Sequence, residues 1–131
     1  MRQIPMLALD LDGKAGSVRL ARQAVQQFLD QLAAAAGPRF RDTTRLDVSV
    51  VVTELVSNAC LHAPGPCRLL VAARPGEIEV AVEDTGHRLL APSVPAGTWV
   101  RGLLVVTRLS RGVHVVPIPG GKVVETVVVE R

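Results

Sequence analysis

The chain has 131 residues, of which 48% are hydrophobic and 21% are charged. This length predicts a single domain over residues 1–131, and the apolar content excludes an intrinsically disordered protein. The net charge is +3, but basic and acidic residues alternate and aromatic residues make up only 2%, which argues against a nucleic-acid partner. No apolar run approaches the roughly 20 residues of a membrane span, and no secretory leader is recognisable, so we expect a cytoplasmic protein without a membrane partner.

The first half of the chain predicts a strand and two helices, which span Met6–Asp12, Ser17–Ala36 and Thr44–Ala63. The strand follows from alternating apolar and polar residues, and the first helix from an apolar stripe at helical spacing. In the second helix, Thr44 and Asp47 resemble a capping box. Its β-branched run at 48–52 favours a strand locally, but the length and an apolar stripe favour a helix. The stripe consists of Leu46, Val50, Leu55 and Ala59.

The second half predicts two hairpins, separated by an irregular stretch and a short helix. The hairpin strands are Arg68–Ala73 with Glu77–Glu83 and Val113–Ile118 with Val123–Val129, and the helix is Gly102–Leu109. The strand from Glu77 alternates aliphatic residues with acids, which indicates one buried face. No strand–helix–strand alternation occurs, which excludes a parallel sheet. We therefore expect an α+β two-layer sandwich, with helices on one face of a mixed, mostly antiparallel sheet.

Three polar residues of the second predicted helix, Glu54, Asn58 and His62, are spaced four apart. They therefore project from one helical face. A solvated stripe on an amphipathic helix would give the same pattern, so this spacing alone does not define a site.

Two further elements favour a functional site. Asp84 ends a strand and is followed by Gly86. A carboxylate there can hold an exocyclic amine while the glycine lets a flat ring approach, although the same residues also form an ordinary turn. Gly102 begins the next predicted helix, whose free N–H groups can bind phosphate, although a plain helix entry is the alternative.

Cys60 and Cys67, together with His62, raise the alternative of a thiolate–imidazole metal site. A fourth ligand is missing and the spacing matches no zinc pattern. We therefore interpret Cys60 as a small apolar residue near a helix end and Cys67 as the first residue of a strand. Two cysteines without a disulfide framework fit a reduced, cytoplasmic protein.

Taken in order, these elements resemble the anti-sigma-factor serine/threonine kinases of the GHKL (histidine-kinase-like) ATPase superfamily. The matching segments are Val51–Ala59 for the N-box, Val82–Gly86 for the first glycine box, Arg101–Val106 for the second, and Pro119–Lys122 before the final strand. The resemblance covers nearly the whole chain, and the N-box is its most specific part. It implies the Bergerat fold, in which ATP binds between helices and sheet.

The resemblance also implies a role for each matching residue. Asn58 would ligate Mg²⁺, Glu54 would orient or deprotonate the attacking hydroxyl, and Asp84 would accept the adenine amino group. The backbone N–H groups at the second glycine box would bind phosphate. The full set placed at the nucleotide is Asn58, His62, Asp84, Gly86, Gly102, Leu103, Leu104 and Thr126.

The chain departs from the family pattern at several positions. His87 and Arg88 follow Gly86 where a second glycine is common, Val100 stands where the second box often has glycine, and Val123 replaces a threonine that supports the adenine-binding aspartate. Thr126 is the candidate substitute for that threonine. Residues 87–101 are expected to form a lid over the pocket, with Trp99 covering exposed core or stacking on the ligand.

The leading hypothesis is an ATP- and Mg²⁺-dependent kinase that phosphorylates an anti-sigma-factor antagonist and, by binding a sigma factor, regulates bacterial transcription. The alternative is a non-catalytic module that binds a sigma factor or antagonist and has a degenerate nucleotide site. A homodimer is left open. A stand-alone ATPase domain of a histidine kinase is disfavoured, because no dimerisation helix or phosphoacceptor segment is recognisable before the domain.

Overall fold

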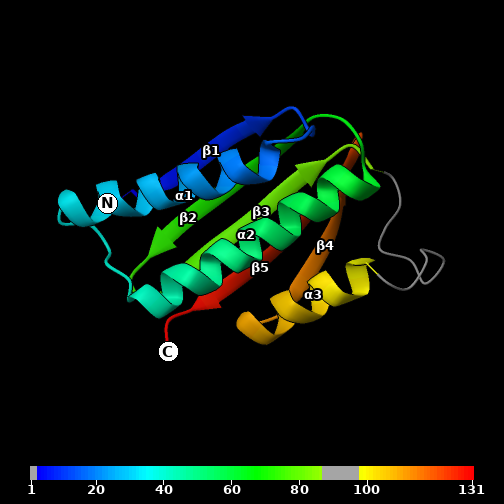
Figure 1. Ribbon diagram of the computed structural model, residues 1–131. Coiled ribbons are helices and arrows are strands. Elements are labelled where there is room, and N and C mark those ends of the chain that lie inside the picture. The colour runs from blue at the N-terminus through cyan, green and yellow to red at the C-terminus, as the bar shows by residue number, and fades with distance from the viewer. Residues whose placement is uncertain (1–2, 87–97) are drawn as a thin grey trace.

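The computed structural model describes residues 3–86 and 98–131, and for residues 98–102 the backbone alone. The elements in chain order are β1 (Met6–Leu11), α1 (Ser17–Ala34), α2 (Asp42–His62), β2 (Cys67–Arg74), β3 (Glu77–Asp84), α3 (Thr98–Leu109), β4 (Val113–Ile118) and β5 (Gly121–Val129). The strands form one sheet in the order β1-β2-β3-β5-β4 (Figure 1). Every neighbouring pair of these strands is antiparallel.

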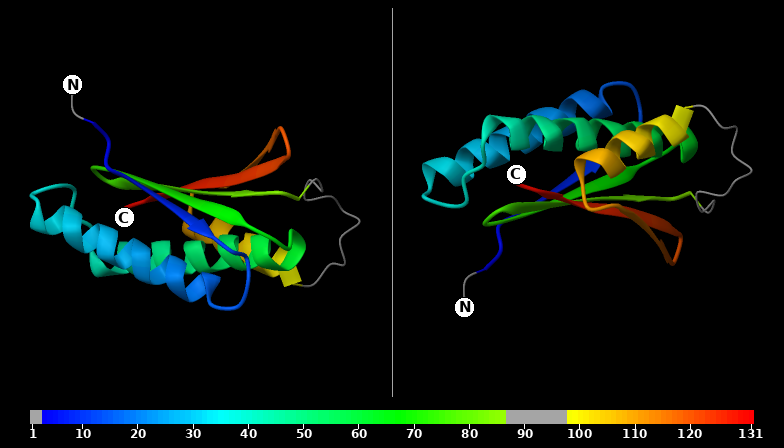
Figure 2. Two further views of the ribbon diagram at one scale, coloured as in Figure 1. Left: turned by 90° about the horizontal axis from the view of Figure 1, so that it is seen from above. Right: turned by 90° about the horizontal axis from the view of Figure 1, so that it is seen from below.

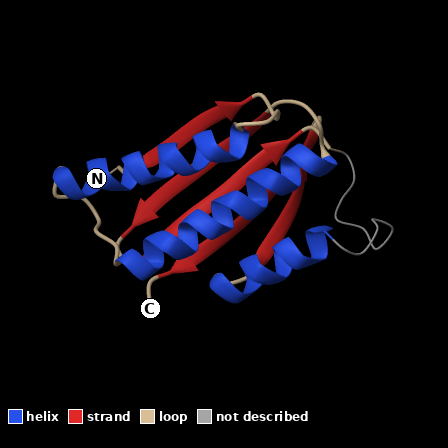
Figure 3. Ribbon diagram, viewed as in Figure 1, coloured by secondary structure: helices blue, strands red, loops and turns tan. Residues whose placement is uncertain are grey.

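The helices and the sheet form two layers. Figure 2 shows α1, α2 and α3 on the same face of the sheet, and Figure 3 shows the three helices in front of the strands. The strand residues that face the helices are buried, including Ile78, Val80 and Val82 of β3, as their alternation predicted. The predicted α+β sandwich is therefore confirmed, and the sheet, expected to be mixed, is antiparallel in its described strands.

The helix α1 forms because its apolar residues recur at helical spacing. Its buried apolar side chains are Ala21, Val25, Phe28 and Leu29. Before the helix, Asp12 accepts hydrogen bonds from the backbone N–H of Lys14 at 2.8 Å and from the hydroxyl of Ser17 at 3.0 Å. These bonds hold the pKa of the Asp12 carboxyl below its usual value and tie the end of β1 to the start of α1.

The helix α2 is confirmed, but two details of its prediction are wrong. It begins at Asp42 without a side-chain cap, so Thr44 lies buried within the first turn and forms no capping box. Its buried face is also rotated from the predicted stripe, because Leu46 is 65% exposed while Val48 and Val51 are fully buried. Burying a valine is worth about 1.5–3 kcal/mol, which exceeds the loss of about 0.5 kcal/mol from its weak helix propensity.

Three segments that are distant in sequence meet at one end of the sandwich (Figure 1). They are the end of α2, the end of β3 and the turn between β4 and β5. The register pairs Asp84 of β3 with Lys122 of β5. A Cβ at Gly121 would lie 1.8 Å from the carbonyl oxygen of Asp84, so only glycine allows the two strands to meet in this way.

Candidate functional site

The polar face of α2 carries Glu54, Asn58 and His62, and all three residues are half-buried. The Oδ1 atom of Asn58 is buried and accepts no hydrogen bond from any described residue. Leaving such an oxygen without a donor costs about 1–3 kcal/mol. Because Mg²⁺ prefers oxygen ligands, the orphaned oxygen of Asn58 fits a metal ligand.

A magnesium site needs few ligands from the protein itself. Among the described residues, no group of three or more His, Cys, Asp or Glu is arranged to hold a metal ion. A site with one or two protein oxygens is typical of Mg²⁺, which keeps waters and shares phosphate oxygens of a substrate. The orphaned oxygen of Asn58 fits that role.

Asp84 is the last residue of β3, and its side chain is only 1% exposed. Its Oδ1 atom accepts hydrogen bonds from the backbone N–H of Gly86 and from Nζ of Lys122, each at 2.8 Å. The Lys122 side chain is 4% exposed, so the two residues form a buried ion pair. No described residue donates a hydrogen bond to the second carboxylate oxygen, Oδ2. One oxygen of Asp84 is thus engaged within the protein, and the other has no donor among the described residues.

Lys122 is the site residue that sequence reasoning missed. It lies on the inward-facing row of β5, whose other members Val124, Thr126 and Val128 are buried. A charged side chain on an apolar row requires a partner of opposite charge, because an unpaired buried ion is very costly. A lysine in this row was therefore the available sequence signal for a partner such as Asp84.

Gly86 lies where the end of α2 meets the turn that follows Asp84. A Cβ at Gly86 would lie 2.8 Å from the Cβ of Ala63 and 2.9 Å from Nζ of Lys122. Because Ala63 directly follows the N-box helix α2, the end of that helix packs against the turn that follows Asp84. The structure therefore brings the C-terminal end of α2 against the first glycine box, and it gives Gly86 a packing role in this contact.

The helix α3 is confirmed, but it begins at Thr98, four residues before the predicted start at Gly102. The first N–H groups of a helix lack partners within it, and in α3 these include residues 98–100. The N–H groups of Gly102, Leu103 and Leu104 are instead directed along the helix toward carbonyls of the preceding turn. Phosphate binding by these three residues would require that the first turn opens.

Thr126 does not lie beside Asp84. It is four residues beyond Lys122 on β5, which corresponds to roughly 13 Å along the strand. Its hydroxyl donates a hydrogen bond to the carbonyl oxygen of Gly112. Lys122, rather than Thr126, occupies the place beside the Asp84 carboxylate. The expected lid spans residues 87–101. Residues 87–97, like the side chain of Trp99, lie outside the described residues, and residues 98–101 belong to the first turn of α3 instead of a loop.

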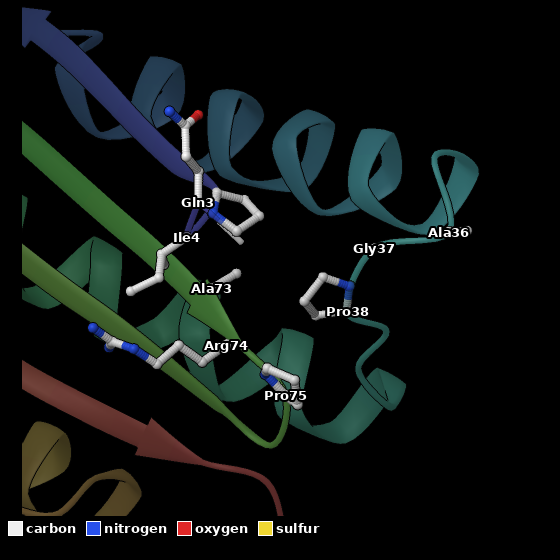
Figure 4. A pocket seen from close by; sticks show the side chains of 9 residues that line it. Gln3, Ile4, Ala36, Gly37, Pro38, Ala73, Arg74 and Pro75 are labelled. Carbon is white, nitrogen blue, oxygen red and sulfur yellow. The ribbon is translucent and has the colours of Figure 1, made fainter. Parts of the chain in front are cut away.

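Two cavities lie at opposite ends of the sheet. One of about 310 Å³ is lined by the end of β1, the start of β2, the end of β3 and the turn between β4 and β5, and Asp84 is among its lining residues. The other, of about 650 Å³, lies between the β2–β3 turn and the loop that follows α1, with Pro38 and Pro75 at its rim (Figure 4). None of the predicted site residues lines this second cavity.

The two cysteines take the positions that the sequence predicts. Cys60 is half-buried near the end of α2, and Cys67 is buried as the first residue of β2. Burial, together with the nearby Cys60 and Asp84, raises the pKa of the Cys67 thiol to about 11. The thiol is therefore held in its protonated, unreactive form at neutral pH.

We expect Cys67 to be alkylated by iodoacetamide at pH 8 more than ~100-fold more slowly than an unperturbed thiol. About one in a thousand Cys67 side chains is a thiolate at that pH, against about a quarter for a free cysteine. Mass spectrometry of the peptides over time measures this rate, with Cys60 as the internal comparison. Alkylation of Cys67 at the rate of a free thiol would contradict the raised pKa.

An antiparallel sheet covered on one face by three helices, with polar residues along α2 and an aspartate at the end of β3, is the arrangement expected of a histidine kinase-like ATPase domain. Residues 13–127 match the family model described as the histidine kinase-like ATPase domain. The chain therefore belongs to this family.

Among solved structures, the chain is similar to the RsbU and RsbW domains of Rv1364c from Mycobacterium tuberculosis, with a TM-score of 0.66 and 18% sequence identity. The match covers 96% of this chain and 32% of that one, so this chain spans about a third of the length of its structural relative. At this identity the likeness shows a shared fold. A comparison with curated proteins gives no match.

No helix in the described part of the chain is both long and apolar enough to span a bilayer.

Proposed function

We propose that this chain binds Mg·ATP and transfers the γ-phosphoryl group to a serine or threonine of an anti-sigma-factor antagonist. It would thereby regulate bacterial transcription in the cytoplasm, together with a sigma factor. Membership of the ATPase family supports nucleotide binding, and the fold shared with a structure that includes an RsbW domain supports the anti-sigma type. The observation that carries the proposal is the orphaned Oδ1 of Asn58, on the helix face that also carries Glu54.

Residues of α2 would serve the phosphate end of the nucleotide. Asn58 would hold Mg²⁺ through Oδ1, and the ion, when bound, offsets the negative charge of the phosphate oxygens. Glu54, one turn earlier on the same face, would orient the attacking hydroxyl and accept its proton. The hydroxyl oxygen then bonds to the γ-phosphorus, the bond from that phosphorus to the β–γ bridging oxygen breaks, and ADP leaves. His62, one turn after Asn58, would flank the nucleotide.

Asp84 would serve the base end. Its Oδ1 is fixed by Gly86 and Lys122, which orients the carboxylate and leaves Oδ2 to accept a hydrogen bond from the adenine amino group. Gly86 would hold this turn against α2, because its lack of a side chain permits the close contact with Ala63. Asn58 and Asp84 would thus define the two ends of one nucleotide site.

Replacing Asn58 with leucine is expected to weaken Mg·ATP binding by at least about tenfold and, at the same time, to raise the free energy of unfolding by about 1 kcal/mol. Binding falls because a metal ligand is lost. Stability rises because a buried oxygen without a donor is removed. Calorimetric titration and urea unfolding measure the two effects. The neighbouring Ser57→Ala variant is the control, and an Asn58→Leu variant with unchanged affinity would refute the metal assignment.

The buried pair of Asp84 and Lys122 favours a second candidate function. In this reading Lys122 neutralises Asp84 and closes the base end, and the chain is a module that binds a sigma factor or its antagonist without turnover. Calorimetric titration of the wild-type chain with ATP, with Mg²⁺ and then with EDTA, separates the two candidates. Mg²⁺-dependent binding, followed by transfer of label to an antagonist, supports the kinase. Absence of ATP binding refutes the kinase and supports the module.

A further inference from the structure

The pair formed by Asp84 and Lys122 places an acceptor and a donor side by side at one buried point. Nζ of Lys122 lies 2.8 Å from Oδ1 of Asp84, and the two side chains are 4% and 1% exposed. An ammonium group has three donors, and in the described residues only the one to Asp84 is engaged. Oδ2 of Asp84 likewise has no described donor. The pair therefore offers one free acceptor and further free donors at adjacent positions.

This arrangement complements one edge of adenine. The exocyclic amino group at N6 is a donor, and the adjacent ring nitrogen N1 is an acceptor. We propose that Lys122 is a second base-binding residue: Asp84 accepts from N6 through Oδ2, and Lys122 donates to N1 from Nζ. The inference rests on the nucleotide-binding function proposed above and adds to it the residue that binds the ring nitrogen N1.

The burial of the pair strengthens the proposed hydrogen bond from Lys122 to N1. A hydrogen bond from a charged donor in a site shielded from water is stronger than one between neutral groups at the surface. Lys122 also takes the place beside Asp84 that Thr126, with its hydroxyl bonded to Gly112, does not reach. If Lys122 only neutralised Asp84, the affinity for a nucleotide would not depend on N1.

The experiment combines a change in the protein with a change in the ligand. The wild-type chain and Lys122→Met are titrated with ATP, with 1-deaza-ATP, in which N1 is replaced by C–H, and with 7-deaza-ATP as the control for loss of a ring nitrogen. In the wild type, 1-deaza-ATP is expected to bind about 10- to 100-fold more weakly than ATP, while 7-deaza-ATP binds like ATP. In Lys122→Met, ATP and 1-deaza-ATP are expected to bind within about twofold of each other, because the donor to N1 is absent.

The ratio of the two affinities within one variant cancels any general weakening caused by the substitution. If the methionine variant does not fold, Lys122→Gln replaces it; its amide keeps an N–H donor toward Asp84 but carries no charge, so the ratio of the two affinities is expected to fall toward one without reaching it. Equal binding of ATP and 1-deaza-ATP to the wild type, or an unchanged ratio in the variant, would overturn the inference and leave the proposed function intact. A wild-type chain that binds no ATP would instead overturn the proposed function, and the inference with it.

Discussion

Replacing Asp84 with asparagine is expected to lower the free energy of unfolding by about 3–5 kcal/mol. The substitution leaves the ammonium group of Lys122 in a position where its side chain is 4% exposed and removes its counter-charge. An unpaired charge at such a position is among the costliest single defects in a protein. Urea-induced unfolding, followed by circular dichroism, measures the difference from the wild type.

Two further variants control this prediction. Asp84→Asn combined with Lys122→Met should recover most of the lost stability, because no buried charge remains unpaired. Glu125→Gln removes an exposed acid from β5 and should change stability by no more than about 0.5 kcal/mol. If Asp84→Asn alone were as stable as the wild type, the buried ion pair would not exist in solution. ATP binding by the single variant is to be measured under conditions in which circular dichroism shows it to be folded, so that unfolding is not mistaken for loss of a base contact.

Replacing Glu54 with glutamine is expected to reduce phosphoryl transfer by ~10²–10⁴-fold, while ATP affinity stays within a few-fold of the wild type. The carboxylate would act on the attacking hydroxyl and not on the nucleotide, so its loss affects the reaction more than binding. Transfer from radiolabelled ATP to a purified anti-sigma-factor antagonist measures the rate, and calorimetry measures the affinity.

The same assay on Glu125→Gln serves as the control, because Glu125 is exposed on the strand β5, away from the polar face of α2. Its transfer rate should equal that of the wild type. Equal transfer by Glu54→Gln and the wild type would refute the role of Glu54 as a proton acceptor. Loss of affinity and of transfer to the same degree would instead assign Glu54 to nucleotide binding.

Much of the fold could be predicted from local sequence patterns. The hairpin strands from Glu77 and from Val113 begin where the structure places them, because alternating burial and a turn between two apolar runs are local features. Helix ends were less predictable: α2 begins at Asp42 and α3 at Thr98, and neither start carries the expected capping or glycine signal. At α2 no side chain caps the first turn, so its start could not be found from a capping pattern.

The candidate site, like the fold, could be predicted only in part from the sequence. Spacing alone places Glu54 and Asn58 on one face of α2, because four residues make about one helical turn. Spacing does not show that Oδ1 of Asn58 is buried without a donor, since that depends on how α2 packs against its neighbours. The distinction matters for function. A buried oxygen without a donor fits a metal ligand, whereas a solvated asparagine is already hydrogen-bonded to water.

By itself, the sequence determined the order and type of the elements and the residues that carry the family's motifs, because hydrophobic periodicity and motif spacing are properties of short segments. Only the tertiary structure decided which residues from distant segments lie side by side. The partner of the Asp84 carboxylate lies 38 residues away in the chain, and the register between β3 and β5 brings it there. A shift of that register by one residue would turn Lys122 to the opposite face of the sheet, and only the packing of the whole core against the helices selects one register over the other.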